Sequence, residues 1–153
     1  MPRLSFDKAD PAASEIRGLI EQLDALLSGL YPAESRHFLS IEQLQQPNVT
    51  LLAARLDGEA VGCGAFVDHD GEYAEIKRMF VVPGCRGLGI GRRILAELEA
   101  RARASGLELS RLETGVRQAH ALSLYERSGY RRRGPFGSYR EDPLCIFMEK
   151  RLA

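Results

Sequence analysis

The sequence predicts an α/β (α+β) fold in which helices flank a mixed, mostly antiparallel central sheet. Three observations support this prediction: an amphipathic helical pattern near the N-terminus, a run of β-rich segments joined by short turns, and a β-α-β order in the second half. With 153 residues the chain has the size of one ordinary domain. We therefore expect a single domain over residues 1–153.

Four segments carry helical patterns. In residues 14–30, leucine and isoleucine recur at i, i+3, i+4 and i+7, which places them on one helix face. A short helix is expected at 40–46, after a turn-like segment. The pattern resumes at 90–102 and stops before Gly106, and a last helix is expected at 118–129, where Gly129 would end it.

The strands are predicted from β-branched and aromatic runs. Residues 49–56, 59–68 and 72–82 are such runs, and Asp-Gly turn signals separate them, so they predict a three-stranded antiparallel meander. Further strands are expected at 109–116, 130–134 and 144–152.

Charge and composition exclude several classes of partner. The 21 Lys and Arg balance the 21 Asp and Glu, so net charge predicts neither a nucleic-acid nor a membrane partner. The three consecutive arginines at 131–133 lack interleaved aromatic residues and are interpreted as a solvated face. The N-terminus has no apolar signal-peptide core, and no run reaches the roughly 18 apolar residues of a membrane span. We expect a cytoplasmic protein.

Neither the cysteines nor the histidines are spaced like metal ligands. The cysteines, Cys63, Cys85 and Cys145, form no CxxC pair, which argues against a disulfide framework and against a thiolate zinc site. The histidines, His37, His69 and His120, are expected to be ordinary surface or turn residues. The sequence therefore predicts no metal site.

The segment PGCRGLGIGRR, residues 83–93, is the most informative motif. Glycines stand at every second position from 87 to 91, arginines flank them, and a predicted helix follows. A glycine-rich turn before a helix lets backbone N–H groups approach an anion at the positive end of the helix dipole. The segment therefore predicts a phosphate-binding loop.

Spacing decides between three types of phosphate loop. A Walker loop needs Lys and then Ser or Thr after its last glycine, but Arg92 and Arg93 follow Gly91. A dinucleotide fingerprint would need a glycine at position 92 or 94, where Arg92 and Ile94 stand. The remaining pattern, Arg86-x-x-Gly89-x-Gly91, resembles the Q/R-x-x-G-x-G/A signature of the GNAT superfamily of acyl-CoA-dependent N-acetyltransferases.

The resemblance to the GNAT superfamily covers residues 49–151, since the meander and the segment LYERSGY at 124–130 also match in order and spacing. It implies a GNAT-like sheet, acetyl-CoA as co-substrate and a bound pyrophosphate at the loop. The family often has Asn seven residues before the tyrosine of this last motif, and this chain has Gln118 there. The implied coenzyme-binding residues are Met79, Phe80, Val81, Arg86, Gly87, Leu88, Gly89, Ile90, Gly91, Arg92, Gln118 and Tyr125.

The resemblance also implies two catalytic residues. Tyr125 stands at the family's tyrosine in LYERSGY, where its phenol would protonate the departing thiolate. Glu75 lies eleven residues before Arg86, where family members that acetylate lysine carry a glutamate. Counted by twos, Glu75, Lys77, Met79 and Val81 share one strand face unless a bulge intervenes. Glu75 is then either a general base or water-positioning group, or an ion-paired structural residue.

The acceptor site is expected where the segment before the meander faces the segment PFGSYREDP. The candidate substrate residues are Tyr31, Arg36, Arg78 and Tyr139. An arginine there could hold a carboxylate, so the preferred function is acetylation of a small amino-acid-like amine. The alternatives are acetylation of protein lysine or N-terminal amines, and a non-catalytic acyl-CoA-binding module. A homodimer is left open.

Overall fold

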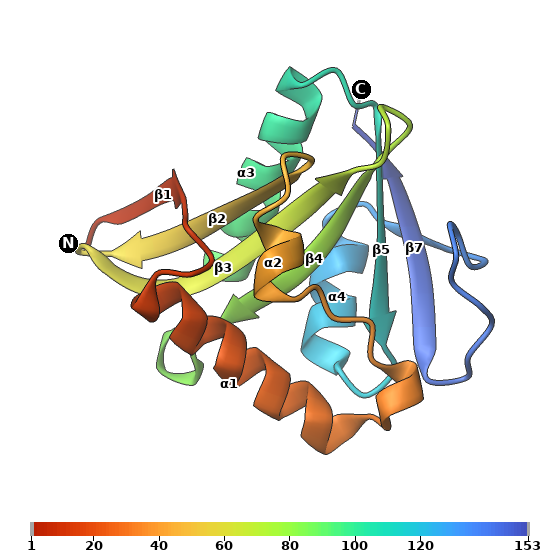
Figure 1. The fold of residues 1–153 in the computed structure, drawn as a ribbon, viewed down its shortest axis with the longest axis horizontal. Coiled ribbons are helices and arrows are strands. Elements are labelled where there is room, and N and C mark those ends of the chain that lie inside the picture. The colour runs from red at the N-terminus through yellow and green to blue at the C-terminus, as the bar shows by residue number, and fades with distance from the viewer. Residues whose placement is uncertain (1, 153) are drawn as a thin grey trace.

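The structure, a computed structural model, describes residues 2–152. Along the chain the elements follow the order helix, meander and β-α-β unit that the sequence predicts (Figure 1). They are β1 (Leu4–Lys8), α1 (Ser14–Leu30), the 3-10 turn η1 (Ala33–Ser35), α2 (Ile41–Leu44), β2 (Val49–Leu56), β3 (Glu59–Asp68), β4 (Ala74–Val81), the 3-10 turn η2 (Pro83–Cys85), α3 (Ile90–Ala104), β5 (Leu109–Gly115), α4 (Ala119–Arg127), β6 (Arg131–Arg133) and β7 (Cys145–Arg151).

The strands form one seven-stranded sheet in the order β1-β2-β3-β4-β5-β7-β6. Only β4 and β5 are parallel, because α3 connects them as a crossover, and every other neighbouring pair is antiparallel. The predicted fold class, a mixed and mostly antiparallel sheet flanked by helices, is confirmed.

The sequence analysis missed one strand, β1. It adds to the edge of the sheet by pairing with β2, with Leu4 opposite Leu56 and Lys8 opposite Leu52. Five residues with two charges among them give too short a pattern to indicate a strand. Its existence depends on the free edge of β2, a property of the assembled sheet.

The helices cover the two faces of the sheet separately. In Figure 1, α1 and α2 lie in front of the sheet, and α3 and α4 lie behind it. The front core is built on Ile16, Leu19 and Leu23 of α1, and the rear core on Ile94 and Leu98 of α3. None of the helices described is both long and apolar enough to cross a bilayer.

The parallel strands β4 and β5 separate after a short contact. They pair only from Ala74–Ile76 to Ser110–Leu112. Beyond that point β4 continues along β3 to Val81, while β5 continues along β7 to Gly115. Figure 1 shows the two strands diverging, with α4 behind the opening. The second half of β4 therefore has one edge without a neighbouring strand.

A β-bulge interrupts β4 at this divergence. Cys63 pairs with Phe80 and Ala65 with Lys77, so Arg78 and Met79 together face Gly64. Arg78 takes a left-handed backbone conformation with φ 59°. The buried thiol of Cys63 donates to the Arg78 carbonyl (3.3 Å), and burial raises the pKa of that thiol to about 12.

The bulge corrects the predicted alternation along β4. Lys77 points to the front face, where its Nζ reaches the carbonyl of His37. Met79 and Val81 instead pack against the rear core with α3. The exception that the sequence analysis allowed is therefore present: a bulge shifts the two-residue period by one, and Glu75, Lys77, Met79 and Val81 do not share one face.

Candidate functional site

The loop between β4 and α3 depends on two glycines in left-handed conformations. Gly87 has φ 83°, and Gly89, the N-cap of α3, has φ 78°. Residues with a Cβ rarely adopt such angles. Both glycines are exposed, as is Leu88 between them. The loop therefore leaves its backbone open to solvent beside the start of the helix.

The first turn of α3 has features that favour an anion. Its N-cap glycine offers no side-chain oxygen, and no acidic residue stands in the first turn. The first N–H groups of a helix have no partner within the helix. Arg92 and Arg93 are exposed there, although cations at a helix N-terminus oppose the helix dipole. A bound phosphate would satisfy both the N–H groups and the arginines.

Arg86 ties this loop to the end of β4. Its Nε donates to the Val81 carbonyl at 2.9 Å, and its guanidinium lies 5.5 Å from the centre of the Phe80 ring. The side chain itself remains exposed. Arg86 thus fixes the loop against the strand while it adds positive charge to the rim.

A cavity of about 90 Å³ lies where β4 and β5 separate. Tyr125 of α4 is part of its wall and is only 6% exposed. No hydrogen bond within residues 2–152 engages the Tyr125 hydroxyl. Burial, and then the nearby Glu113, raise the pKa of this phenol, so it stays protonated at neutral pH. The cavity therefore holds a neutral hydroxyl donor at its base.

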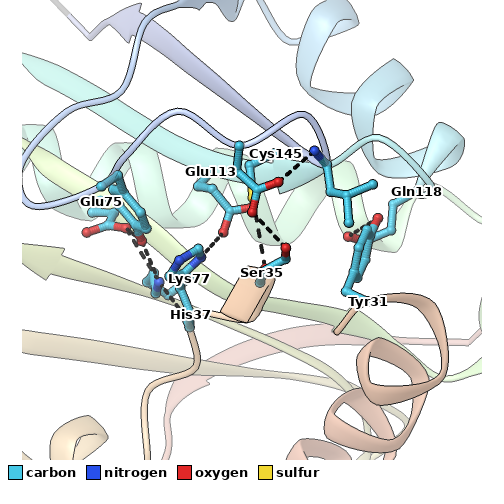
Figure 2. Close-up of polar contacts among 11 residues, drawn as sticks. Tyr31, Ser35, His37, Glu75, Lys77, Glu113, Gln118 and Cys145 are labelled. Carbon is cyan, nitrogen blue, oxygen red and sulfur yellow. Dashed lines mark hydrogen bonds and ion pairs between the residues drawn. The ribbon is translucent and has the colours of Figure 1, made fainter. Parts of the chain in front are cut away.

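The C-terminal end of α1 and the N-terminal end of α4 meet at another wall of this cavity. The Tyr31 hydroxyl donates to Gln118 Oε1 at 3.4 Å and accepts from the Arg117 backbone N–H at 3.0 Å. Tyr31 also lies against Gly115, where a Cβ would overlap its ring. Tyr31 and Gln118 therefore brace each other beside the opening (Figure 2).

Glu113 and His37 form a hydrogen-bonded pair in the cavity wall. His37 Nδ1 lies 3.2 Å from Glu113 Oε1, and the side chains are 34% and 14% exposed. Burial raises the pKa of Glu113, and the hydrogen bond from His37 opposes that rise. The Cys145 thiol lies close by, and the three donor groups fall within 4.8 Å of one another. Figure 2 shows the pair pointing toward one another.

Glu75 belongs to a neighbouring cluster. Its carboxylate accepts from the Tyr139 hydroxyl (2.5 Å) and lies 2.9 Å from His69 Nε2. Lys77 Nζ is 3.5 Å away, and it donates to the Tyr139 hydroxyl at 2.8 Å. Glu75 is buried but is not among the residues that line the cavity. Its partners are Tyr139 in the segment before β7, His69 in the β3–β4 turn and Lys77 of β4 itself.

Comparison with known proteins decides the family. A sequence model of the Acetyltransferase (GNAT) family matches residues 20–130. This chain belongs to the GNAT family. The IAA acetyltransferase of Azospirillum brasilense is 49% identical over 153 residues, which is 99% of this chain and 100% of that protein. GNAT membership makes the protein an acyltransferase with acetyl-CoA as its acyl donor.

Solved GNAT structures share the fold. A crystal structure of a Klebsiella pneumoniae protein assigned to the acyl-CoA N-acyltransferases superposes with a TM-score of 0.85 at 39% identity, and covers 98% of each chain. The PaiA N-acetyltransferase of Thermoplasma acidophilum, crystallised with coenzyme A, has a TM-score of 0.76 at 20% identity, over 97% of this chain and 99% of that one. The predicted superfamily is confirmed.

The structure brings several of the expected GNAT site residues to the separation of β4 and β5. Met79, Gln118, Tyr125, Tyr31 and Arg36 all line the cavity. The glycine loop from Arg86 to Arg92 follows β4 after the 3-10 turn η2. Phe80 differs, because its side chain packs in the front core and leaves only its backbone toward β5.

Two other expected substrate residues are already engaged by protein groups. Arg78 lines the cavity, but its guanidinium donates to Asp24 Oδ1 (2.5 Å) and to the Leu39 carbonyl (2.8 Å). Tyr139 hydrogen-bonds Glu75 and Lys77 instead of lining the cavity. Both hold the surrounding segments in place.

Sequence reasoning missed His37 and Glu113 as a pair. They are 76 residues apart, and no local spacing connects them. His37 was expected to be an ordinary surface or turn residue, and Glu113 sits inside a strand pattern. Only the pairing of β5 with β7, and the path of the chain after α1, place the two side chains together.

Proposed function

We propose that this GNAT enzyme transfers the acetyl group of acetyl-CoA to the primary amine of a small amino-acid-like molecule. The pyrophosphate would bind the N–H groups of the glycine loop and the first turn of α3, with Arg86 and Arg92 adding charge. The pantetheine arm would pair with the free edge of β4 at Met79, Phe80 and Val81, in the manner of an added strand. Gln118, braced by Tyr31, would border the arm.

The reaction needs a neutral amine, an aligned thioester and a proton for the leaving group. The amine nitrogen attacks the carbonyl carbon, the C–N bond forms and the C–S bond breaks. Tyr125 is proposed to give its phenolic proton to the thiolate, because it is protonated and lies in the cavity wall without a protein partner. The proton that leaves the new amide nitrogen restores the phenol.

The proposed class of acceptor depends on Arg36. It lines the cavity, and its Nε is buried without a hydrogen-bond partner within residues 2–152. The Nη1 atom donates to Ser28 Oγ at 2.6 Å, which fixes the guanidinium. A buried N–H without a partner costs free energy unless a ligand accepts from it. A carboxylate on the acceptor would supply that oxygen.

The role of Glu75 as general base stays a prediction. Its separation from the cavity lining and its contacts with Tyr139 and Lys77 favour a supporting role, in which it fixes the groups around the acceptor.

The test is release of coenzyme A thiol from acetyl-CoA with matched acceptors. The panel pairs α-amino acids with the amines left by their decarboxylation, and adds lysine-containing peptides. We expect faster acetylation of the carboxylate-bearing partner, and Arg36→Gln should raise its KM about tenfold or more while leaving the decarboxylated amine unaffected. Arg17→Gln, an exposed change on α1, is the control. Preferential acetylation of peptides, or no thiol release with any amine, would overturn the proposal.

A further inference from the structure

His37 is a loop residue that three other parts of the fold hold in place. Its carbonyl accepts from Lys77 Nζ of β4 at 2.7 Å. Its ring meets the Tyr139 ring edge-on, with 5.0 Å between centroids. Its Nδ1 lies 3.2 Å from Glu113 of β5. These three contacts fix the orientation of the His37 ring. An ordinary surface histidine does not need such contacts, so the arrangement indicates that the orientation of this ring is important.

The contact with Glu113 determines which ring nitrogen is free. When the Glu113 carboxylate is ionised it only accepts hydrogen bonds, so Nδ1 then carries the hydrogen. In the neutral ring Nε2 then bears a lone pair. No hydrogen bond within the described residues 2–152 engages Nε2. The ring therefore presents a free proton acceptor from the cavity wall.

The pair lines the same cavity as the proposed acid. His37, Glu113 and Tyr125 all line the same cavity, and the charge of Glu113 acts on the Tyr125 phenol. His37 is the more exposed member of the pair, with 34% of its side chain accessible against 14% for Glu113. A molecule that enters the cavity therefore meets the imidazole, while the carboxylate stands behind it.

We propose that His37 Nε2 takes the proton of the acceptor ammonium and that Glu113 positions the ring. This inference rests on the proposed N-acetylation. The ammonium gives one proton to Nε2 and becomes a neutral amine, whose lone pair attacks the thioester carbon. The imidazolium, stabilised by the Glu113 carboxylate, releases that proton to solvent after the acetylated product leaves. His37 is then a catalytic residue, and Glu113 is a positioning residue.

Several other charged or titratable groups face the pair and would shape its pH dependence. They are Lys77 and Glu75 from β4, Tyr125 from α4, Cys145 from β7, Tyr139 and Asp142 from the segment before β7, and Tyr31 and Arg36 from the segment after α1. Lys77 and Arg36 bring positive charge to the cavity and Glu75 and Glu113 bring negative charge, so both signs of charge are present around the pair.

The first experiment compares acceptors that need deprotonation with one that does not. His37→Gln should lower kcat/KM at pH 7 by about 10² with the fastest amino acid of the panel. The loss should shrink as pH rises and the acceptor ammonium loses its proton to solvent. With methoxyamine, which is already neutral at pH 7, the variant should match the wild type within about threefold. A loss of equal size for both acceptors would overturn the proposal.

Variants of the surrounding groups separate the roles. Glu113→Gln should lower kcat by about tenfold and change the pH profile, and Glu113→Asp should restore part of the rate. His120→Gln, an exposed change on α4, should leave the rate unchanged. Glu75→Gln should lower kcat/KM less than His37→Gln does. If Glu75→Gln has the larger effect, Glu75 is the general base and the proposal is overturned.

The second experiment needs no acceptor. Nitrogen-15 NMR of the free enzyme should show His37 as the Nδ1–H tautomer, and Glu113→Gln should change the tautomer populations. An Nε2–H tautomer, or tautomer populations that Glu113→Gln leaves unchanged, would overturn the proposal even if no amine in the panel is acetylated. Loss of activity with EDTA and its recovery with Zn²⁺ would also overturn it, because His37, Glu113 and Cys145 would then be metal ligands.

Discussion

The Tyr31 ring occupies the space in which a side chain on Gly115 would begin. Gly115 is the last residue of β5, and Tyr31 is the first residue after α1. The close approach lets the Tyr31 hydroxyl reach the Arg117 backbone N–H and Gln118 at the start of α4. Because Gly115 has no side chain, Tyr31 can approach β5 and connect the end of α1 to the start of α4 at the edge of the cavity.

Gly115→Ala should therefore displace Tyr31 and enlarge or distort the acceptor cavity. Overpacking of this kind costs about 1–3 kcal/mol of unfolding free energy. We expect a raised KM for the acceptor, with the affinity for acetyl-CoA nearly unchanged, in steady-state kinetics and urea unfolding. Gly29→Ala is the matched control, since a Cβ there meets no atom within 4 Å and alanine favours the helix. Equal effects of both substitutions would contradict this account.

Gly89→Asp should abolish binding of acetyl-CoA. The substitution adds a side chain at φ 78° and a negative charge beside the N–H groups of α3. In the wild type, acetyl-CoA at a hundred times its Kd should raise the unfolding free energy by about 2.7 kcal/mol. Thermal unfolding with and without acetyl-CoA measures the difference. A folded variant that retains the full ligand-induced shift in Tm would refute the loop as the coenzyme site.

Tyr125→Phe should keep the fold and the affinity for acetyl-CoA but lose turnover. The ring and its T-shaped contact with Tyr130 at 5.9 Å remain, and only the hydroxyl is removed. If the phenol protonates the thiolate, kcat should fall at least about tenfold, which equals roughly 1.4 kcal/mol of transition-state free energy. Tyr73→Phe, outside the cavity, is the control. Unchanged kcat under conditions in which chemistry limits the rate would leave Tyr125 with packing alone.

The ion pairs of Glu149 should stabilise the fold by an amount that decreases at acid pH. Burial raises the pKa of Glu149, but hydrogen bonds from Arg111 (2.7 Å) and Arg133 (2.5 Å) outweigh burial and hold the pKa below its usual value. A carboxyl with a lowered pKa in the folded state stabilises the fold above the unfolded-state pKa, near 4.5, and loses that contribution as pH falls.

Glu149→Gln should therefore lower the unfolding free energy at pH 7 by about 1 kcal/mol, a small value because solvent screens this partly exposed cluster. The difference from the wild type should shrink below pH 4.5. Urea unfolding across pH measures it. A difference that stays constant with pH would show that the ion pairs contribute nothing.

The sequence by itself determined most of the helices and strands and the glycine-rich turn before α3. Hydrophobic periodicity over residues 14–30 and 90–102 predicts α1 and α3, because each helix buries one continuous face. The glycine spacing at 87–91 predicts the anion site, because its geometry depends on backbone angles that only neighbouring residues set. Tyr125 is predicted from the resemblance of LYERSGY, residues 124–130, to the GNAT family.

The tertiary structure alone decided which side chains meet. The bulge at Arg78 reverses the faces of β4 after Lys77, and it arises from pairing with β3, which the local sequence does not specify. The strand β1 forms because β2 has a free edge. His37 reaches Glu113 because β4 and β5 separate and the chain after α1 covers the opening. Such contacts depend on the register and path of distant segments, whereas local periodicity records only which face of each element is buried.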